Sequence, residues 1–487
     1  MSLESQSRQQ KRYTRIAVRS DDDFQRLYFL MMDYIREPEL ALSVKEFVFR
    51  FHLPRHEVYL RVTERPEVLR AEENARDISQ EHTISQFVTS LGIEEPKKSD
   101  WIRILTWMKP ELVAAREEAT ANDPRSFEVE PFYRHRTKLF AQHAAAALLM
   151  ICPNIEILKF EEGSRMVEDF LRRNNYGLLA STHLQKLRHV TLIPTTEMIL
   201  GDERFYISLD ILALLRLFHR LPAIESVSTG GVGPDNDGGY VRLFPPATSN
   251  LKSIHVGHSL YGADVITTLI RLPKRLEQFT LTTGGRNSLH GGYEIVSARQ
   301  IGKALYQQRT WLRKIDIDID EYVNMGGDED YHIDDEEEED EWYQRDMEIS
   351  PGPVTVPKTR EYGATIGPMH DFESLTHLSI GIRLLLGGRY YGRSDNVDTP
   401  FRLIDALPKS LEYLLIRGYE RGTVEQYDSQ IDELLRLKQD RLPMLAELHG
   451  IDETIPIGLS VENPDENSDE LWEPESEDDD WEEEEAL

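Results

Sequence analysis

A six-residue pattern of apolar and polar positions recurs along the chain, with apolar residues at its first, fourth and sixth positions. Apolar residues that alternate with polar ones are typical of a strand that buries one face. Seven clear copies start at Ile155, Leu187, Leu251, Leu276, Leu312, Leu375 and Leu411, and four weaker ones start at Tyr13, Val44, Ile224 and Leu445. We therefore predict a strand at each copy.

The spacing of the copies leaves room for a helix between successive strands. From Ile155 onward most steps are 25 to 37 residues long, and the one step of 63 residues contains an acidic insertion. Apolar residues three and four positions apart predict helices over 167–179, 207–219, 263–272, 296–307 and 427–437. Because proline cannot continue a helix, the Leu-Pro pairs at 221–222, 272–273, 407–408 and 442–443 mark turns into the next strand.

Two α/β architectures alternate strands with helices in this way. The strands of a doubly wound sheet are buried on both faces and read as continuous apolar runs. Here polar residues such as His189, Ser253 and Asp316 separate the apolar ones. We therefore predict an α/β leucine-rich-repeat solenoid, with parallel strands in chain order on a concave face, helices on a convex face and irregular repeats of about 25–37 residues. The predicted core includes Leu187, Val190, Leu192, Leu251, Ile254, Leu276, Phe279, Leu312, Ile315, Leu378, Leu411 and Leu414.

Changes in pattern along the chain predict its domain organisation. Residues 1–62 hold the first repeats and a helix between them, and residues 63–150 form a helical insert with helices over 101–108, 110–119 and 132–150. The solenoid proper spans 151–457. Residues 326–350 and 458–487 are strongly acidic, and we expect both segments to be disordered.

The charge of the chain is concentrated in these two acidic segments. The whole chain has 87 Asp and Glu against 56 Lys and Arg, a net charge of −31. Residues 328–348 contain 13 acids and one base, and residues 461–487 contain 15 acids and no base, which leaves about −4 for the rest. This balance predicts no nucleic-acid partner. Aromatic residues among the acids, such as Trp342 and Trp472, are also a feature of tails that capture basic proteins, histones among them.

No set of residues in the sequence predicts catalysis, a cofactor or a metal site. The glycine-rich segment from Ser228 lacks the Gly-Lys-Ser/Thr ending of a phosphate-binding loop. The 15 histidines form no HExxH motif, and the single cysteine, Cys152, cannot build a thiolate zinc site or an intramolecular disulfide. A lone cysteine fits a reducing compartment, and neither a signal peptide nor a membrane span is predicted, so we expect a non-enzyme in the cytoplasm or nucleus.

The outward positions of the strands are the candidate binding residues. The third and fifth residues of each copy, and the residue after the sixth, should point away from the core. This places Glu46, Lys159, Glu161, His189, His255, Gln278, Lys314, Asp316, His377, Tyr413 and Arg417 on the predicted concave face. Polar and charged residues mixed with Tyr and Arg suit a surface that binds another protein. The alternative is that they are solvated strand residues without a ligand.

Several segments resemble fungal F-box/leucine-rich-repeat proteins of the substrate-receptor type. They are RSDDDFQRLYFLMMDYIREPELALSVKEFVF from Arg19, LLMICPNIEIL from Leu148, FESLTHLSIGIRLLLGG from Phe372, LPKSLEYLLIRGY from Leu407 and RLPMLAELHGIDETIP from Arg441. The resemblance implies a repeat fold that recognises substrates for an SCF-type ubiquitin ligase. Only a short polar stretch precedes Tyr13. We therefore expect the F-box to be missing, and a Skp-type adaptor to bind only where an F-box is supplied.

Two functions are consistent with the sequence. The first is a non-enzymatic scaffold that binds a protein partner on the concave face, with SCF-type substrate recognition as one form of it. The alternative is an acidic, chaperone-like binder of basic nuclear proteins such as histones. No membrane partner is expected.

Overall fold

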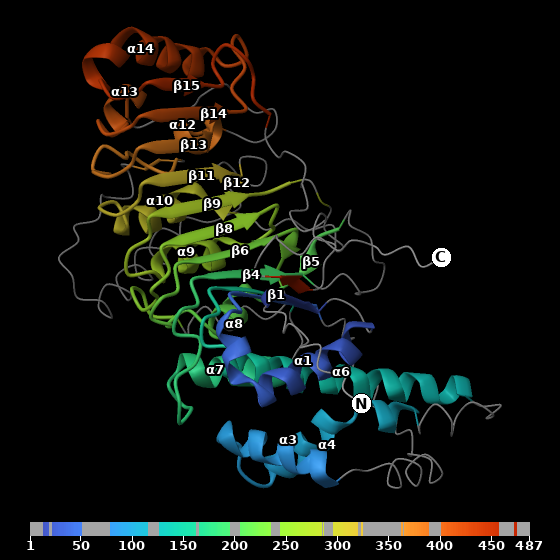
Figure 1. Cartoon of the computed structure of the whole chain (residues 1–487). Coiled ribbons are helices and arrows are strands. Elements are labelled where there is room, and N and C mark those ends of the chain that lie inside the picture. The colour runs from blue at the N-terminus through green and yellow to red at the C-terminus, as the bar shows by residue number, and fades with distance from the viewer. Residues whose placement is uncertain are drawn as a thin grey trace, which may run out of the picture. The chain divides into compact units, whose positions relative to one another are not determined.

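A computed structural model gives the structure of the chain (Figure 1). It describes residues 13–18, 22–50, 78–114, 126–161, 165–194, 205–234, 244–284, 286, 296–319, 323–324, 362–363, 365–388, 401–456 and 472–474. The chain forms two compact units. Unit 1 comprises Met1–Glu197, Leu221–Ala223 and Pro464–Leu487, and unit 2 comprises Met198–Arg220 and Ile224–Asn463. The predicted insert of 63–150 is not a separate unit, because the helix Ser126–Ile151 contacts the helices Asp22–Arg36 and Arg165–Asn175.

Unit 1 combines a parallel sheet with a set of helices. Its strands β1 (Tyr13–Val18), β2 (Glu46–Phe49), β3 (Ile157–Glu161) and β4 (His189–Ile193) pair in parallel and in chain order. Its helices are α1 (Asp22–Arg36), the 3-10 helix η1 (Pro38–Leu42), α3 (Ile78–Ser90), α4 (Lys97–Thr106), α6 (Ser126–Ile151) and α7 (Arg165–Asn175). Helix α6 contacts α1, α4 and α7, so the predicted helical insert is part of this unit.

Unit 2 contains a longer parallel sheet. Its strands pair in the order β6 (Ser226–Gly230), β8 (Ser253–Gly257), β9 (Gln278–Thr282), β11 (Lys314–Asp318), β13 (His377–Gly381), β14 (Tyr413–Arg417) and β15 (Glu447–His449). Two short parallel pairs accompany it, β5 (Ile207–Ser208) with β7 (Val232–Gly233) and β10 (Val296–Ser297) with β12 (Val323–Asn324). Its helices are α8 (Ile211–Leu215), α9 (Ala263–Arg271), α10 (Ala298–Gln307), α12 (Ile382–Leu386), α13 (Leu403–Ala406) and α14 (Glu425–Arg441).

All eleven copies of the sequence pattern form strands, four in unit 1 and seven in unit 2. Within each unit, the strands formed by copies of the pattern lie in the same order in space as in the chain. A doubly wound sheet instead places later strands on both sides of the first one. The predicted parallel strands in chain order are therefore confirmed within each unit.

The apolar positions of the pattern form the core. All twelve residues that we predicted to be buried are at most 1 % exposed. Helices α9 and α10 contact each other and lie on the far side of the strands in the view of Figure 1. Burial of this apolar area is the main driving force for such a fold.

Buried polar side chains join neighbouring repeats through the backbone. The side-chain oxygen of Gln308 accepts a hydrogen bond from the Leu276 N–H, and its amide group donates to the carbonyls of Ile270 and Pro273. Ser249 Oγ donates to the carbonyl of His219 and accepts from the Leu251 N–H. These bonds satisfy backbone groups of the turns that lead into β8 and β9, which would otherwise be buried without partners.

Some predicted elements differ in length or type. The predicted helix over 207–219 is instead the strand β5 followed by the short helix α8, because Asp210 caps α8 by accepting a hydrogen bond from the Ala213 N–H at 2.8 Å. Of the predicted helix over 110–119, residues 110–114 are helical and the rest lies outside the described residues.

The two acidic segments fall largely outside the described residues. This holds for all of 326–350 and for 458–487 apart from one short element. That element is β16 (Trp472–Pro474), which pairs antiparallel with β1. The expectation of a wholly unstructured tail did not foresee this strand.

Candidate protein-binding face

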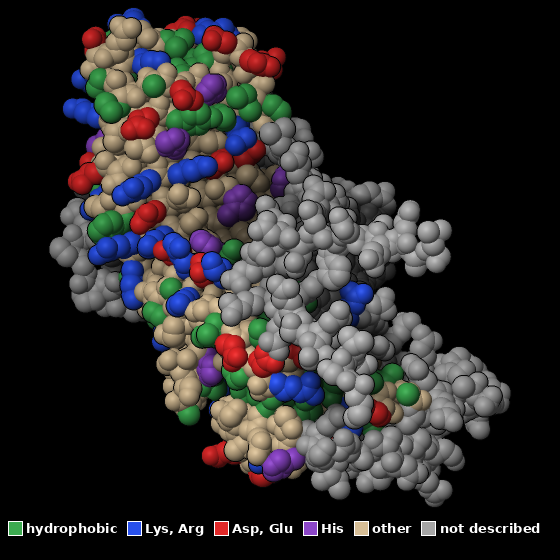
Figure 2. All heavy atoms as spheres, viewed as in Figure 1, with side chains coloured by type: hydrophobic (Ala, Val, Ile, Leu, Met, Phe, Trp, Pro, Cys, Tyr) green, Lys and Arg blue, Asp and Glu red, His purple; other side chains and the backbone are tan. Residues whose placement is uncertain are grey.

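The register of unit 2 arranges the outward positions in two rows across the sheet. The row of third positions is Ser226, Ser253, Gln278, Lys314, His377, Tyr413 and Glu447, and the row of fifth positions is Ser228, His255, Thr280, Asp316, Ser379, Leu415 and His449. We call these two rows the open face. All of its residues except Ser379 are exposed or half-buried. Figure 2 shows charged and histidine side chains spread over this side of unit 2.

The corresponding positions of unit 1 are half-buried or buried. Ala17, Val48 and Ile193 form a small buried apolar cluster on β1, β2 and β4. Glu161, which we predicted to lie on the binding face, is only 1 % exposed, so that prediction is wrong. The outward rule assumes that these positions meet solvent on every strand, and packing in unit 1 buries Glu161 instead.

Two of the three remaining predicted residues of unit 1, Glu46 and Lys159, belong to a local ion-pair group. Glu46 lies between two cations, with its carboxylate 3.4 Å from Arg15 Nε and 3.3 Å from Lys159 Nζ. His189 is half-buried on β4. Glu46 and Lys159 thus bind each other, and the other seven predicted residues belong to unit 2.

An ion-pair network marks the carboxyl ends of the central strands in unit 2. The Arg417 guanidinium on β14 lies 3.0 Å from Asp316 and 3.9 Å from Asp318, both on β11, and donates to Ser379 Oγ on β13 at 2.9 Å. Arg417 and Asp318 are 13 % and 2 % exposed at their side chains. Three partners on two strands hold the Arg417 guanidinium in one position. Removal of any charged member would leave a partly buried charge without its counter-ion.

An aromatic row lies next to this network on the open face. The rings of His377 and Tyr413 stack with centroids 5.7 Å apart and planes 22° apart, and His449 follows with its centroid 5.4 Å from that of Tyr413. His377 and His449 are exposed, and Tyr413 is half-buried. Burial raises the pKa of Tyr413, so its hydroxyl stays protonated and can donate a hydrogen bond.

Three predicted residues lie beside these two groups. His255, Gln278 and Lys314 are exposed on β8, β9 and β11. Partial desolvation on the sheet lowers the pKa of His255, against the opposing effect of the Asp316 carboxylate. His255 is therefore neutral at physiological pH and offers both a donor and an acceptor to a ligand.

Sequence reasoning missed Arg15, Asp318, Glu447 and His449, although the same positional rule finds them. Arg15 is the third residue of the copy at Tyr13, and Asp318 follows the sixth residue of the copy at Leu312. Glu447 and His449 are the third and fifth residues of the weakest copy, at Leu445. Applying the rule to every copy would have found all four.

Other candidate chemistry is not assembled in the residues that the structure describes. The glycine-rich segment from Ser228 forms the end of β6 and the strand β7 as far as Gly233. Cys152 is buried, and burial raises the pKa of its thiol. Within the described ranges, no group of three or more His, Cys, Asp or Glu residues is placed to hold a metal ion. No described helix has both the length and the apolar character that crossing a bilayer requires.

Comparison with known proteins gives no family for this chain. No protein-family model matches it, and a search of curated proteins finds no match.

Proposed function

We propose that this chain is a leucine-rich-repeat solenoid that binds a protein partner on the open face of unit 2. Strands that pair in parallel and in chain order, with one helix-covered and one wet face, support a repeat architecture. Each repeat then contacts only its neighbours and contributes its outward residues to one continuous surface. Such surfaces are typical of proteins that hold another macromolecule rather than transform it.

The observation that carries this proposal is the aromatic row of His377, Tyr413 and His449. Stacked rings are held with little rotational freedom, so binding costs less side-chain entropy than it would for long flexible residues. Tyr is enriched among the residues that dominate binding energy, and the central position of Tyr413 between two rings gives a partner a flat, partly apolar surface. The adjacent Arg417 network adds fixed polar groups that would orient the ligand.

The proposed role includes substrate recognition for an SCF-type ubiquitin ligase. Its support is the resemblance of five segments to F-box/leucine-rich-repeat substrate receptors. On this proposal the open face selects the substrate, and ubiquitin transfer belongs to other subunits. We propose no catalytic residue in this chain.

Affinity purification of the tagged chain from its native cells tests the proposal. We expect the double variant Tyr413→Ala with His377→Ala to lose its specific protein partners, because both substitutions remove ring area from the open face without breaking the core. Co-purification of a Skp-type adaptor and a cullin with the unaltered chain would support the ligase role. Histones retained by the double variant would instead favour the acidic segments as the binding element.

The matched control replaces two lysines of unit 1. Lys97 and Lys98 lie on α4 of unit 1, and the variant with both changed to Ala should keep every partner. Arg417 is unsuitable for this test, because its loss would leave Asp316 and Asp318 close together and would disturb folding. The proposal is wrong if the Tyr413 and His377 variant folds, as judged by circular dichroism, and captures the same partners as the unaltered chain.

A further inference from the structure

Four cations gather where the chain enters two neighbouring strands of unit 2. Lys274 and Arg275 lie in the turn before β9, and Arg313 and Lys314 lie at the start of β11. The Arg313 N–H donates to the Glu277 carbonyl at 2.8 Å, which fixes the two turns side by side. We call Lys274, Arg275, Arg313 and Lys314 the basic edge. Figure 2 shows Lys and Arg side chains gathered along this end of the strands.

None of these four cations pairs with a carboxylate among the residues that the structure describes. Lys274 Nζ donates to the side-chain oxygen of Asn250 at 2.9 Å. The Arg275 guanidinium lies over the ring of Trp311, 4.6 Å from its centroid, and Trp311 is 41 % exposed. The basic edge is therefore an exposed cluster of like charge around one indole.

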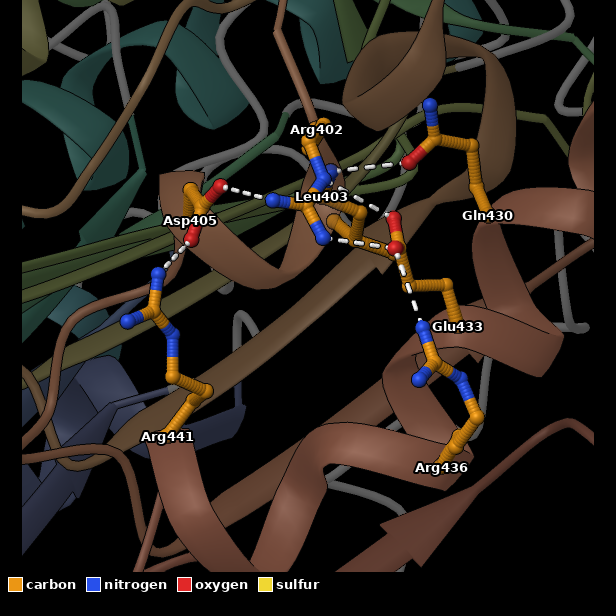
Figure 3. Close-up of polar contacts among 7 residues, drawn as sticks. All are labelled: Arg402, Leu403, Asp405, Gln430, Glu433, Arg436 and Arg441. Carbon is orange, nitrogen blue, oxygen red and sulfur yellow. Dashed lines mark hydrogen bonds and ion pairs between the residues drawn. The ribbon is translucent and has the colours of Figure 1, made fainter.

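A second cluster of arginines in unit 2 differs from the basic edge, because its members pair with carboxylates. Arg402 donates to Glu433 at 2.6 Å and to Asp405 at 3.0 Å, Arg436 pairs with Glu433, and Arg441 pairs with Asp405 (Figure 3). The hydrogen bond from Arg402 lowers the pKa of Glu433, as the bond from Arg441 lowers that of Asp405. A chain with 87 acids and 56 bases has carboxylates to spare, yet none of the described ones neutralises the basic edge.

We propose that the basic edge binds acidic side chains of a protein ligand that lies across the open face. The inference rests on the proposed function, and it deepens that proposal by naming the chemistry of the partner. Lys314 belongs to both surfaces, since it is a third-position residue of the open face and a member of the basic edge. A ligand that contacts His377 and Tyr413 on the next strands would therefore reach the basic edge without a gap.

The pattern of charges favours discrete carboxylates over a nucleic-acid backbone. Glu277 separates Lys252 from Arg313 along the rungs of the sheet, and a continuous row of phosphates would meet this carboxylate. Arg275 covers one face of the Trp311 ring, which a base would need for stacking. Lys252, which lies outside the basic edge and pairs with Glu225 at 3.3 Å, is two strands from Arg313, about 10 Å away. Acidic residues three positions apart in a polyproline II peptide, which rises about 3.1 Å per residue, have about the same spacing and point to the same side.

Cross-linking of the full chain tests which carboxylates the basic edge takes. A carbodiimide joins a carboxylate to a lysine amine only where the two are in contact. The probe is a synthetic peptide of about 15 residues with Glu at every third position among Ser and Tyr. We expect the probe to be joined to Lys274 and Lys314 but not to Lys97 and Lys98.

Joining to all four lysines alike, or to none, would overturn the proposal. Joining of the chain's own acidic segments to Lys274 and Lys314 in place of the probe would also overturn it, and would make those segments the occupant.

Affinity measured by fluorescence anisotropy gives the second test. The variant Arg275→Gln with Arg313→Gln should weaken binding of the probe about 2- to 30-fold, the combined effect of losing two exposed charge contacts. The matched control, Arg172→Gln with Arg173→Gln on α7, removes the same charge and should change the affinity little. A single-stranded DNA of equal charge that binds more tightly than the peptide, and depends on the same two arginines, would replace the acidic ligand with nucleic acid.

The two proposals fail in distinguishable ways. The Tyr413 and His377 variant could lose the native partners while the Arg275 and Arg313 variant keeps them. The basic edge would then have no role in binding, and the open face would remain the binding surface. If the arginine variant alone loses the partners, the open face is not the recognition surface.

Discussion

At the scale of single residues, the first apolar position of a repeat tests the assignment of the core. Leu276 and Leu411 begin the repeats of β9 and β14, and both are fully buried. Truncation of either to Ala removes apolar contacts and leaves a cavity, so we expect a loss of about 2–5 kcal/mol in unfolding free energy. Urea denaturation followed by circular dichroism measures this loss. The exposed Met444, changed to Ala, is the control and should cost far less. Equal losses at the buried and the exposed positions would contradict the assigned core.

His219 links folding stability to pH. Burial, with a smaller contribution from Arg220 and Arg216, lowers its pKa from 6.5 to about 4. The unfolded chain therefore binds a proton at His219 below pH 6.5, whereas the folded chain stays unprotonated until about pH 4. Unfolding takes up a proton in this window, so stability falls as the pH drops through it, by about 2–3 kcal/mol between pH 7 and pH 4.5.

The variant His219→Phe isolates this effect. Phe keeps a ring beside Phe244, whose centroid is 5.3 Å from that of His219, but it cannot titrate. Urea denaturation at several pH values should give a shallower fall in stability for the variant over the same range. Parallel pH profiles for the two proteins would show that the pKa of His219 is the same in the folded and the unfolded chain.

At the scale of elements, the pairing of β16 with β1 has a measurable consequence. β1 pairs with β2 along one side, and β16 places Trp472 opposite Ile16 and Glu473 opposite Arg15 along the other. Proline donates no backbone hydrogen bond. The double variant Trp472→Pro with Glu473→Pro should therefore release β16 and speed amide exchange in β1, measured by mass spectrometry, while β2 stays protected.

A second proline variant controls for the effect of proline itself. Asn467→Pro with Ser468→Pro changes the same chain outside β16 and should leave exchange in β1 as it is in the unaltered chain. If β1 exchanges equally in all three proteins, the pairing of β16 with β1 does not persist in solution.

The elements also show which parts of the fold a single sequence can predict. The strands followed from the local alternation of apolar and polar residues, which each copy of the pattern contains by itself. The region over 207–219 was misjudged because β5 pairs with β7, and no local pattern reveals a two-residue strand of this kind. β16 depends in the same way on pairing with a strand more than 450 residues earlier in the chain.

The candidate site shows the same limit. The positional rule found the exposed residues of unit 2, but it could not show that Arg417 pairs with Asp316, which is 101 residues away. That contact requires the register of β11, β13 and β14 relative to one another. Glu161 failed for a related reason, since the burial of its face depends on packing that the pattern of its own strand does not record.

At the scale of the whole molecule, the net charge of −31 conceals how its charges are distributed. Counting along the chain correctly locates the acidic segments, but it treats the rest as nearly neutral. In unit 2 the parallel strands bring turns from separate repeats to one edge, and four cations meet there. Linear charge counts locate runs of like charge along the chain, and they are uninformative for residues that a sheet brings together.

The register of β11 with β13 does not depend on the length of the chain that joins them. Ile315 and Ile317 face Leu378 and Ile380, although the connection runs from Asp318 to His377. The same two residues of β11, Ile315 and Ile317, also face Phe279 and Leu281 of β9, and the connection between β9 and β11 is much shorter. An evolving gene can therefore lengthen, shorten or replace this connection without moving any strand to a new neighbour. The connection is thus a position at which a lineage could acquire new sequence while it keeps its repeats.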